Sequence, residues 1–202
     1  MRDAGIGRVL VASLHQGIAD LLPTRLEFYE NWFNPIGLRD GTIGLAPLAA
    51  VLSFLRRENG MYAAVTERAG DYAAQWTVLG MSGLRTRGIR ALPRALRTRF
   101  ALGVARRLVR ETYAGSRAVV KVRKNQARVD LRSSIFCGVR EPVDMPLCRY
   151  YAAAFERVLT LLEAPGTVDV VQCRGAGESR CVLTVTFGSG GRPAMAGREV
   201  SP

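Results

Sequence analysis

Residues 170–187, "VVQCRGAGESRCVLTVTF", combine a strand pattern with half of the chain's cysteines. Residues typical of β-strands lie on both sides of the glycine-bearing centre "GAG", which is the pattern of two β-strands joined by a tight turn. Cys173 and Cys181 stand on either side of this turn. The stretch therefore predicts a hairpin that brings two of the chain's four cysteines to the same end.

A second hairpin and one helix precede it. The segment "SRAVVKVRKNQARVDLRSSIF" alternates apolar and charged residues around a Lys124-Asn125-Gln126 turn, so it predicts a hairpin with one solvated face. The segment "DMPLCRYYAAAFERVLTLLEA" predicts a helix, with Asp144 as its cap and Pro146 in its first turn. If the two hairpins are neighbours in one sheet, this helix connects them.

Helical periodicity dominates the first half of the chain. An amphipathic helix is predicted to end at Pro23, and Gly70 is a weak point in a later helix. Helices followed by hairpins indicate an α+β fold, with N-terminal helices packed on one face of a four-stranded antiparallel sheet. We expect one domain over residues 1–187 and a disordered glycine-rich tail over 188–202. The apolar positions used for the first helix are Val9, Leu10, Leu14, Ile18 and Leu21, and those for the last helix before the strands are Leu92, Leu96, Phe100, Val104 and Leu108.

The chain has no convincing membrane span. Its longest apolar run, "IGLAPLAAVLSFL", is too short for a bilayer and contains Pro47, so a buried helix is the better interpretation. We expect a soluble, cytoplasmic protein. In that compartment cysteines more often bind metal or stay reduced than form disulfides.

All four cysteines fall in the last third of the chain. Cys137 follows the second predicted strand, Cys148 lies in the first turn of the helix, and Cys173 and Cys181 flank the second turn. Adjacent hairpins would gather these thiols at one end of the sheet. Four soft thiolates suit a closed, structural zinc site. The alternative is that they are small buried apolar side chains that hold no metal.

The residues from "SSIFCGVREPVDMPLCRYYAAAFERVL" to "VDVVQCRGAGESRCVLTV" resemble the 4-vinyl reductase domain. This family is named after a protein linked to bacteriochlorophyll synthesis, and its domain also occurs in the sensor regions of aromatic-responsive transcription regulators. Cys148, the stretch "YYAAAF", Cys173, Gly177 and Cys181 match the family's pattern in order and spacing. The resemblance covers residues 117–187 well, and the helical half agrees only in the order of its elements.

This resemblance implies a TRAPP-subunit-like fold, shared with haem-NO-binding domains, that forms homodimers and encloses an apolar cavity. It also implies a zinc ion held by cysteines beside the ligand pocket, with help from an acidic residue. Val170 and Val171 stand where that acidic residue is expected, so we expect Cys137 to be the fourth ligand beside Cys148, Cys173 and Cys181.

No catalytic constellation stands out. His15 is the only histidine, and neither "GAG" nor "GSGG" has the strand–loop–helix context of a phosphate loop. We therefore expect a module that binds a small hydrophobic molecule, sensory or carrier in kind, rather than an enzyme. Trp32, Trp76 and Tyr151 are the residues predicted to line its pocket. The alternative that the family name suggests is an enzyme or carrier in tetrapyrrole or bacteriochlorophyll synthesis.

Arginine is abundant, and the formal net charge is +12. Nine arginines lie between Arg85 and Arg110, and no acid occurs before Glu111. This run permits an arginine-rich surface for nucleic acid or an anionic membrane. It lacks the regularly interleaved aromatic residues of single-strand binders, so a solvated helix face is the interpretation that we favour.

Overall fold

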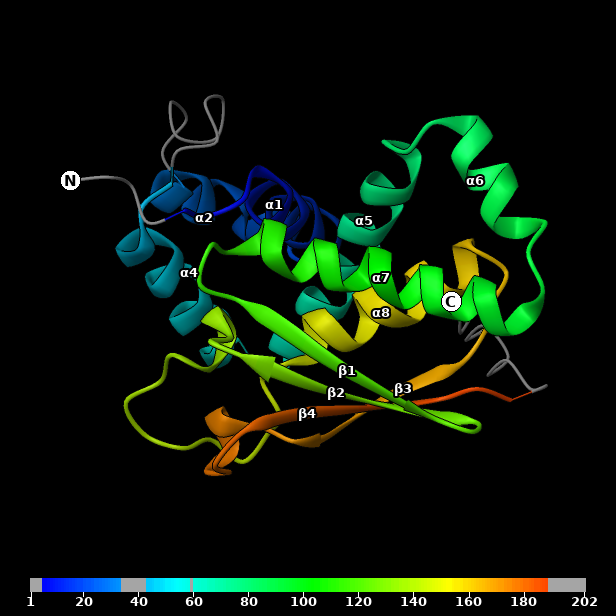
Figure 1. Cartoon of the computed structure of the whole chain (residues 1–202). Coiled ribbons are helices and arrows are strands. Elements are labelled where there is room, and N and C mark those ends of the chain that lie inside the picture. Colours follow the sequence, from blue (N-terminus) through cyan, green and yellow to red (C-terminus); the bar gives the residue numbers. More distant parts are fainter. Residues whose placement is uncertain (1–4, 34–42, 59, 189–202) are drawn as a thin grey trace, which may run out of the picture.

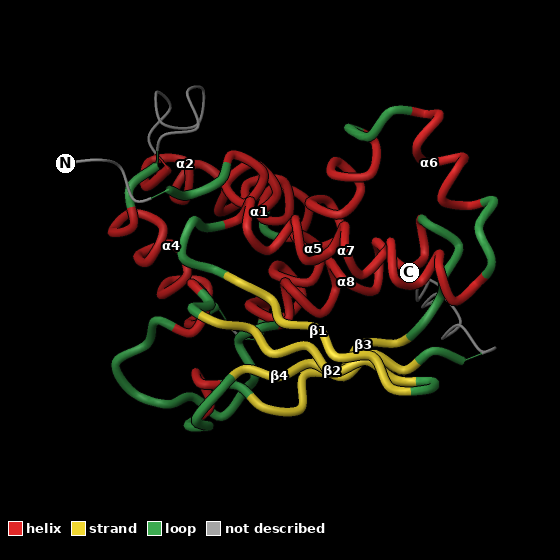
Figure 2. Tube along the Cα trace, in the orientation of Figure 1, coloured by secondary structure: helices red, strands yellow, loops and turns green. Residues whose placement is uncertain are grey.

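In the part of the chain that the structure describes, seven α-helices lie on one side of a four-stranded antiparallel sheet (Figures 1 and 2). The computed structural model describes residues 5–33, 43–58 and 60–188. The predicted disordered tail lies outside these residues except for Gly188. The α+β prediction is confirmed. The helices are α1 (Arg8–Leu21), α2 (Leu26–Phe33), α4 (Leu45–Arg57), α5 (Met61–Leu79), α6 (Gly83–Arg90), α7 (Arg94–Thr112) and α8 (Arg149–Leu161).

The sheet has the strand order β1-β2-β4-β3. The two hairpins are adjacent, which meets the condition for bringing the cysteines together, because β2 pairs with β4 and Leu131 lies opposite Cys181. This pairing puts the end of β2 next to the start of β4, where the cysteine-bearing segments leave the sheet. The strands are β1 (Arg117–Arg123), β2 (Gln126–Arg132), β3 (Thr167–Gln172) and β4 (Cys181–Thr186), and short 3₁₀ turns occupy Pro23–Arg25, Ile135–Cys137 and Arg174–Ala176.

Helix α5 is the centre of the helical layer, and glycine lets it approach its neighbours closely. A Cβ atom on Gly70 would lie 2.2 Å from the carbonyl oxygen of Tyr150 on α8. A Cβ atom on Gly17 of α1 would lie 2.9 Å from the carbonyl oxygen of Val65 on α5. The sequence suggested that Gly70 is a weak point of the helix, and the structure shows that it is not. The helix runs through it, and the missing side chain is what lets α8 cross there.

Helix α8 begins later than predicted. Its first residue is Arg149, so neither Asp144 nor Pro146 belongs to it. The chain before the helix instead packs across the second hairpin's turn, where the amide of Val143 donates to the carbonyl of Gly175 at 2.8 Å. Contacts with the distant hairpin thus override the local capping signal.

The apolar stripe predicted for α7 is only partly buried. Val104 and Leu108 are buried, but Leu96 is 45% and Phe100 is 50% exposed. Helix α6 stands away from the first turns of α7 (Figure 1), so these two side chains have no helical layer to cover them. The prediction that Phe100 faces the core is wrong. Among the described residues, no helix combines the length and apolarity that a bilayer crossing requires.

Candidate metal centre and ligand groove

The four cysteines converge. Their sulfur atoms all lie within 4.8 Å of one another, although they come from four separate segments. Cys137 ends a 3₁₀ turn after β2, Cys148 immediately precedes α8, Cys173 follows β3, and Cys181 begins β4. None of them is in a disulfide, and all but Cys137 are buried.

The distances between the sulfur atoms suit a tetrahedral ion. Zinc–sulfur bonds of about 2.3 Å place the corners of a tetrahedron about 3.8 Å apart. The Sγ of Cys137 lies 3.2 Å from that of Cys148 and 3.5 Å from those of Cys173 and Cys181. Cys148 and Cys173 are 3.8 Å apart. A zinc ion at the centre of this cluster requires only small adjustments of the side chains.

Backbone amides point at two of the sulfur atoms. The N–H of Leu147 donates to Cys173 Sγ at 3.2 Å, and the N–H of Arg174 donates to Cys181 Sγ at 3.4 Å. Hydrogen bonds from the neighbouring thiols, first that of Cys137, and then from Leu147, lower the pKa of Cys173. Such donors favour the ionised sulfur that binds metal. The donor set therefore fits a soft tetrahedral ion such as zinc.

The interior beside the cysteines is filled by aromatic rings. Phe136 stacks on Tyr150 with ring centres 4.8 Å apart and meets Tyr151 edge-on at 5.3 Å. The hydroxyl of Tyr62 donates to the carbonyl of Leu147 at 3.2 Å, next to the cluster. All of these rings are fully buried. Packed side chains thus occupy the region where the family resemblance implied an apolar cavity.

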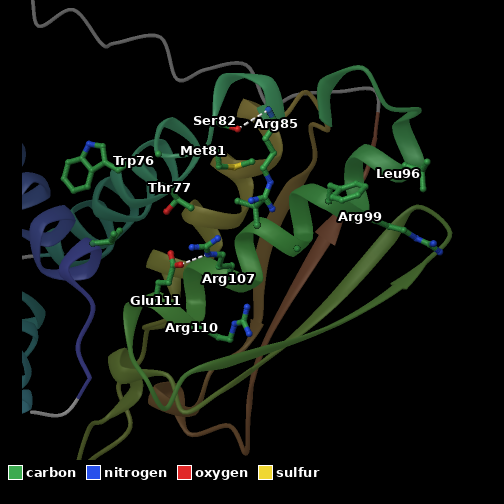
Figure 3. Close-up of a pocket in the computed structure, with 15 residues that line it drawn as sticks. Trp76, Thr77, Met81, Ser82, Arg85, Leu96, Arg99, Arg107, Arg110 and Glu111 are labelled. Atoms are coloured by element: carbon green, nitrogen blue, oxygen red, sulfur yellow. Dashed lines mark hydrogen bonds and ion pairs between the residues drawn. The ribbon is translucent and has the colours of Figure 1, made fainter. Parts of the chain in front are cut away.

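A groove of about 870 Å³ lies along the outer side of α7, and none of the cysteines lines it. Its walls are the end of α5, the start of α6 and the exposed flank of α7, and it is open to solvent (Figure 3). Its size suits a small-molecule ligand. Its lining residues are Val9, Trp76, Thr77, Gly80, Met81, Ser82, Arg85, Leu96, Arg99, Phe100, Gly103, Val104, Arg107, Arg110 and Glu111.

The groove combines apolar and basic side chains. Figure 3 shows Arg85 reaching from α6 toward α7, and Arg107 paired with Glu111 on α7. A smaller basic groove continues around α7, because Gly103 and Arg110 line both. Met81, Leu96 and Phe100 supply much of the apolar surface of the larger groove.

The three residues predicted to bind ligand do not meet. Trp76 lines the groove, with its ring stacked on Tyr72 at 5.6 Å. Trp32 is 40% exposed on α2, packs against Phe54 and does not line the groove. Tyr151 is fully buried, with its hydroxyl 3.5 Å from the hydroxyls of Thr112 and Ser116.

Neither Tyr151 nor the single histidine is placed to take part in chemistry at the cysteines. Burial raises the pKa of Tyr151 to about 12, so its hydroxyl remains protonated at neutral pH. His15 pairs with Glu30 at 2.8 Å and joins α1 to α2. The single histidine is therefore not part of the cysteine cluster.

Sequence reasoning did not pick out the groove arginines individually. It assigned the run from Arg85 to Arg110 to a solvated face, yet Arg85, Arg99 and Arg110 share a concave surface with apolar side chains. The available signal was the spacing on α7, where Leu96, Phe100 and Val104 form a stripe next to one formed by Arg99 and Arg110. The spacing of residues on α7 does not show that α6 stands away from that helix.

No family model and no curated protein sequence matches the chain. The fold, however, is similar to that of solved structures. One is the phenol-responsive sensory domain of the transcription activator PoxR in complex with phenol. It has a TM-score of 0.53 and 13% identity, over 72% of this chain and 75% of that one.

Two further neighbours cover more of the chain. A doubly substituted Tt H-NOX domain aligns with a TM-score of 0.52 and 12% identity, over 90% of this chain and 95% of that one. A structure described as "Modulating Heme Redox Potential Through Protein-Induced Porphyrin Distortion" aligns with a TM-score of 0.50 and 12% identity, over 90% of this chain and all of that one. At such identities these likenesses show a shared α+β fold.

Proposed function

We propose that the chain is a small-molecule-binding module, sensory or carrier in kind, whose ligand occupies the groove between α5, α6 and α7. The observation that carries this proposal is the groove itself, which has about 870 Å³ of open space and a mixed apolar and basic lining. The likeness in fold to a phenol-responsive sensory domain supports it. The resemblance of residues 117–187 to the 4-vinyl reductase domain supports it from the sequence.

The second part of the proposal is a structural zinc ion held by Cys137, Cys148, Cys173 and Cys181. The convergence of four sulfur atoms within 4.8 Å supports it, as do the two N–H donors directed at sulfur. Bound zinc would supply charge neutralisation and cross-linking of the four segments, with no open coordination position for chemistry. The cluster would then hold the start of α8 against the second hairpin.

The family resemblance also leads us to propose a homodimer. Leu79 and Leu84, which are 78% and 82% exposed near the groove, are apolar side chains that a second copy would cover. Light scattering of the purified chain measures its mass directly. A monomer at all concentrations would remove this part of the proposal and leave the ligand site untouched.

Tryptophan fluorescence tests the ligand site, because the chain has only two tryptophans. In Trp32→Phe the remaining reporter is Trp76, which lines the groove, and in Trp76→Phe it is the distant Trp32. Titration with dodecanol, a neutral apolar probe, should change the emission of Trp32→Phe and leave that of Trp76→Phe constant. An equal response of the two variants, or none from either, would contradict binding in the groove.

Metal analysis tests the cysteine site. We expect about one zinc per purified chain, and Cys173→Ser should lower that content at least about tenfold, because the remaining thiolates leave the ion incompletely coordinated. Val171→Ser is the matched control, since Val171 is exposed on β3, the strand that leads to Cys173. A chain that retains no metal in its native form, and whose stability is indifferent to added zinc, would show that the thiols are only buried apolar groups.

A further inference from the structure

The flank of α7 that faces the groove carries two neighbouring stripes. Leu96, Phe100 and Val104 repeat at four-residue steps, so they form one row of side chains on the helix. Arg99 and Arg110 are eleven residues apart, which is close to three full turns, so they form the adjacent row. A molecule lying along α7 therefore meets an apolar row and a basic row side by side.

The charges of the groove are unbalanced. Four arginines and one glutamate line it, and the glutamate, Glu111, is already paired with Arg107. Arg85, Arg99 and Arg110 have no carboxylate of any described residue within ion-pair distance. Guanidinium groups on a concave surface that have no carboxylate partner attract an anion.

Gly103 gives an independent sign that the groove holds something. It lies inside α7, where glycine costs about 1 kcal/mol relative to alanine. Packing does not require it, because a Cβ atom there would meet nothing within 4 Å. Gly103 lies between the two stripes and lines both grooves. The absent side chain leaves space at the point where an occupant would cross α7.

From these three observations we infer that the groove binds an amphiphilic anion, a molecule with a carboxylate or phosphate group and an apolar body. This inference rests on the proposed ligand site and names its ligand class. The head group pairs with Arg99 or with Arg110, because guanidinium binds carboxylate and phosphate oxygens in pairs and three helical turns, about 16 Å, separate the two residues along α7. The apolar body lies against Met81, Leu96 and Phe100.

Other occupants use only part of this surface. A neutral aromatic molecule leaves the three arginines unpaired. A nucleic acid pairs with the arginines but leaves the aliphatic wall, with Met81 and Leu96, without a matching group. The combination of an apolar wall with guanidinium groups that have no carboxylate partner is what favours the amphiphile.

The test compares dodecanoate and dodecyl phosphate with dodecanol and inorganic phosphate by calorimetry, on the full chain. We expect both anionic amphiphiles to bind at least about tenfold more tightly than dodecanol, and this margin should shrink as salt is added. Inorganic phosphate should bind weakly, because it gains nothing from the apolar wall.

Three variants locate the binding. Arg99→Ala combined with Arg110→Ala should remove the preference for the anion and leave dodecanol binding nearly unchanged. Arg87→Ala combined with Arg94→Ala is the charge-matched control, because both side chains are exposed and line neither groove. Gly103→Leu should block all of the amphiphiles by filling the groove. Circular dichroism confirms that each variant is folded.

Each other result overturns the inference in a recognisable way. Dodecanol binding as tightly as dodecanoate would leave the proposed function standing and refute the anion. Inorganic phosphate binding as tightly as dodecyl phosphate would refute the apolar contribution. An oligonucleotide or anionic vesicle that binds through Arg99 and Arg110, without any binding of dodecanoate, would assign the groove to a different partner. If none of the amphiphiles bound, the groove would cease to be a ligand site at all.

Discussion

At the scale of single residues, a partly buried carboxyl group on α5 makes stability depend on pH. Burial raises the pKa of Asp71 from 3.8 to about 6, against the opposing effect of Arg157. Between these two values the folded chain holds a proton that the unfolded chain has released. The stability that this group contributes is therefore present at low pH and is lost as the pH rises through about 6.

Asp71→Asn should remove the destabilisation that the ionised, partly buried carboxylate causes at neutral pH. Near pH 7.5 we expect the variant to unfold about 2–4 °C above the native chain, a gain of about 1 kcal/mol after allowance for partial exposure. Near pH 4 the two should unfold at nearly the same temperature. Calorimetry across this pH range measures the difference. Asp169→Asn, at an exposed position on β3, is the control, and a gain of the same size and pH dependence in it would refute the assignment.

The sequence identified the candidate metal ligands, but it did not show where the aromatic side chains lie in the fold. The four cysteines could be singled out from the sequence, because thiols are few in this chain and their offsets from two hairpins and a helix were visible. Trp32, Trp76 and Tyr151 could not be placed, because aromatic side chains serve cores and pockets equally well. The structure puts them on the surface, in the groove and in the core respectively.

At the scale of elements, two glycines in long helices have opposite roles. Gly70 lies where α5 meets α8, and a Cβ atom there would overlap the carbonyl oxygen of Tyr150. Gly103 faces open space on α7. Periodicity alone does not distinguish them, since both are single glycines inside helical patterns.

Substitution by alanine should change the free energy of unfolding in opposite directions at Gly70 and Gly103. Gly70→Ala should lower the free energy of unfolding by about 2 kcal/mol or more, because α5 and α8 must move apart. Gly103→Ala should raise it by about 0.5–1 kcal/mol, because alanine favours the helix and meets no neighbour. Urea unfolding of both variants gives the two values. Changes of the same sign at the two positions would contradict the close crossing of α5 and α8.

Some helix boundaries are set by neighbouring residues in the sequence, and others are set by contacts with distant segments. The ends of α1 and α5 were predictable, because proline and glycine act on their own neighbours in the chain. The start of α8 was not, because residues 143–148 contact a hairpin that comes later in the sequence. A capping residue such as Asp144 stabilises a helix by only about 1 kcal/mol, so such contacts override it.

At the scale of the whole molecule, the cysteine cluster joins segments that lie far apart in the sequence. If zinc holds them, a chelator should lower the unfolding temperature by about 10 °C and speed hydrogen exchange in residues 133–148 and 173–181. The pairing of Ala127 with Val185 should keep its protection, because it lies at the opposite end of the β2–β4 pairing from Cys181. If the chelator reduced hydrogen-exchange protection uniformly, or not at all, the ion would not stabilise these segments locally.

The kinds and order of the elements could be predicted from local pattern, because each follows from interactions within a few residues or from the short turns that connect neighbouring strands. The pairing of β2 with β4, which joins the two hairpins and gathers the four thiols at one end, depends on contacts between segments that are distant in the sequence. Only the tertiary structure decided that rings fill the space beside the thiols, and that α6 stands off α7 to leave a basic and apolar groove. Those features depend on how side chains from distant helices pack together, and local pattern carries no record of the space left between them.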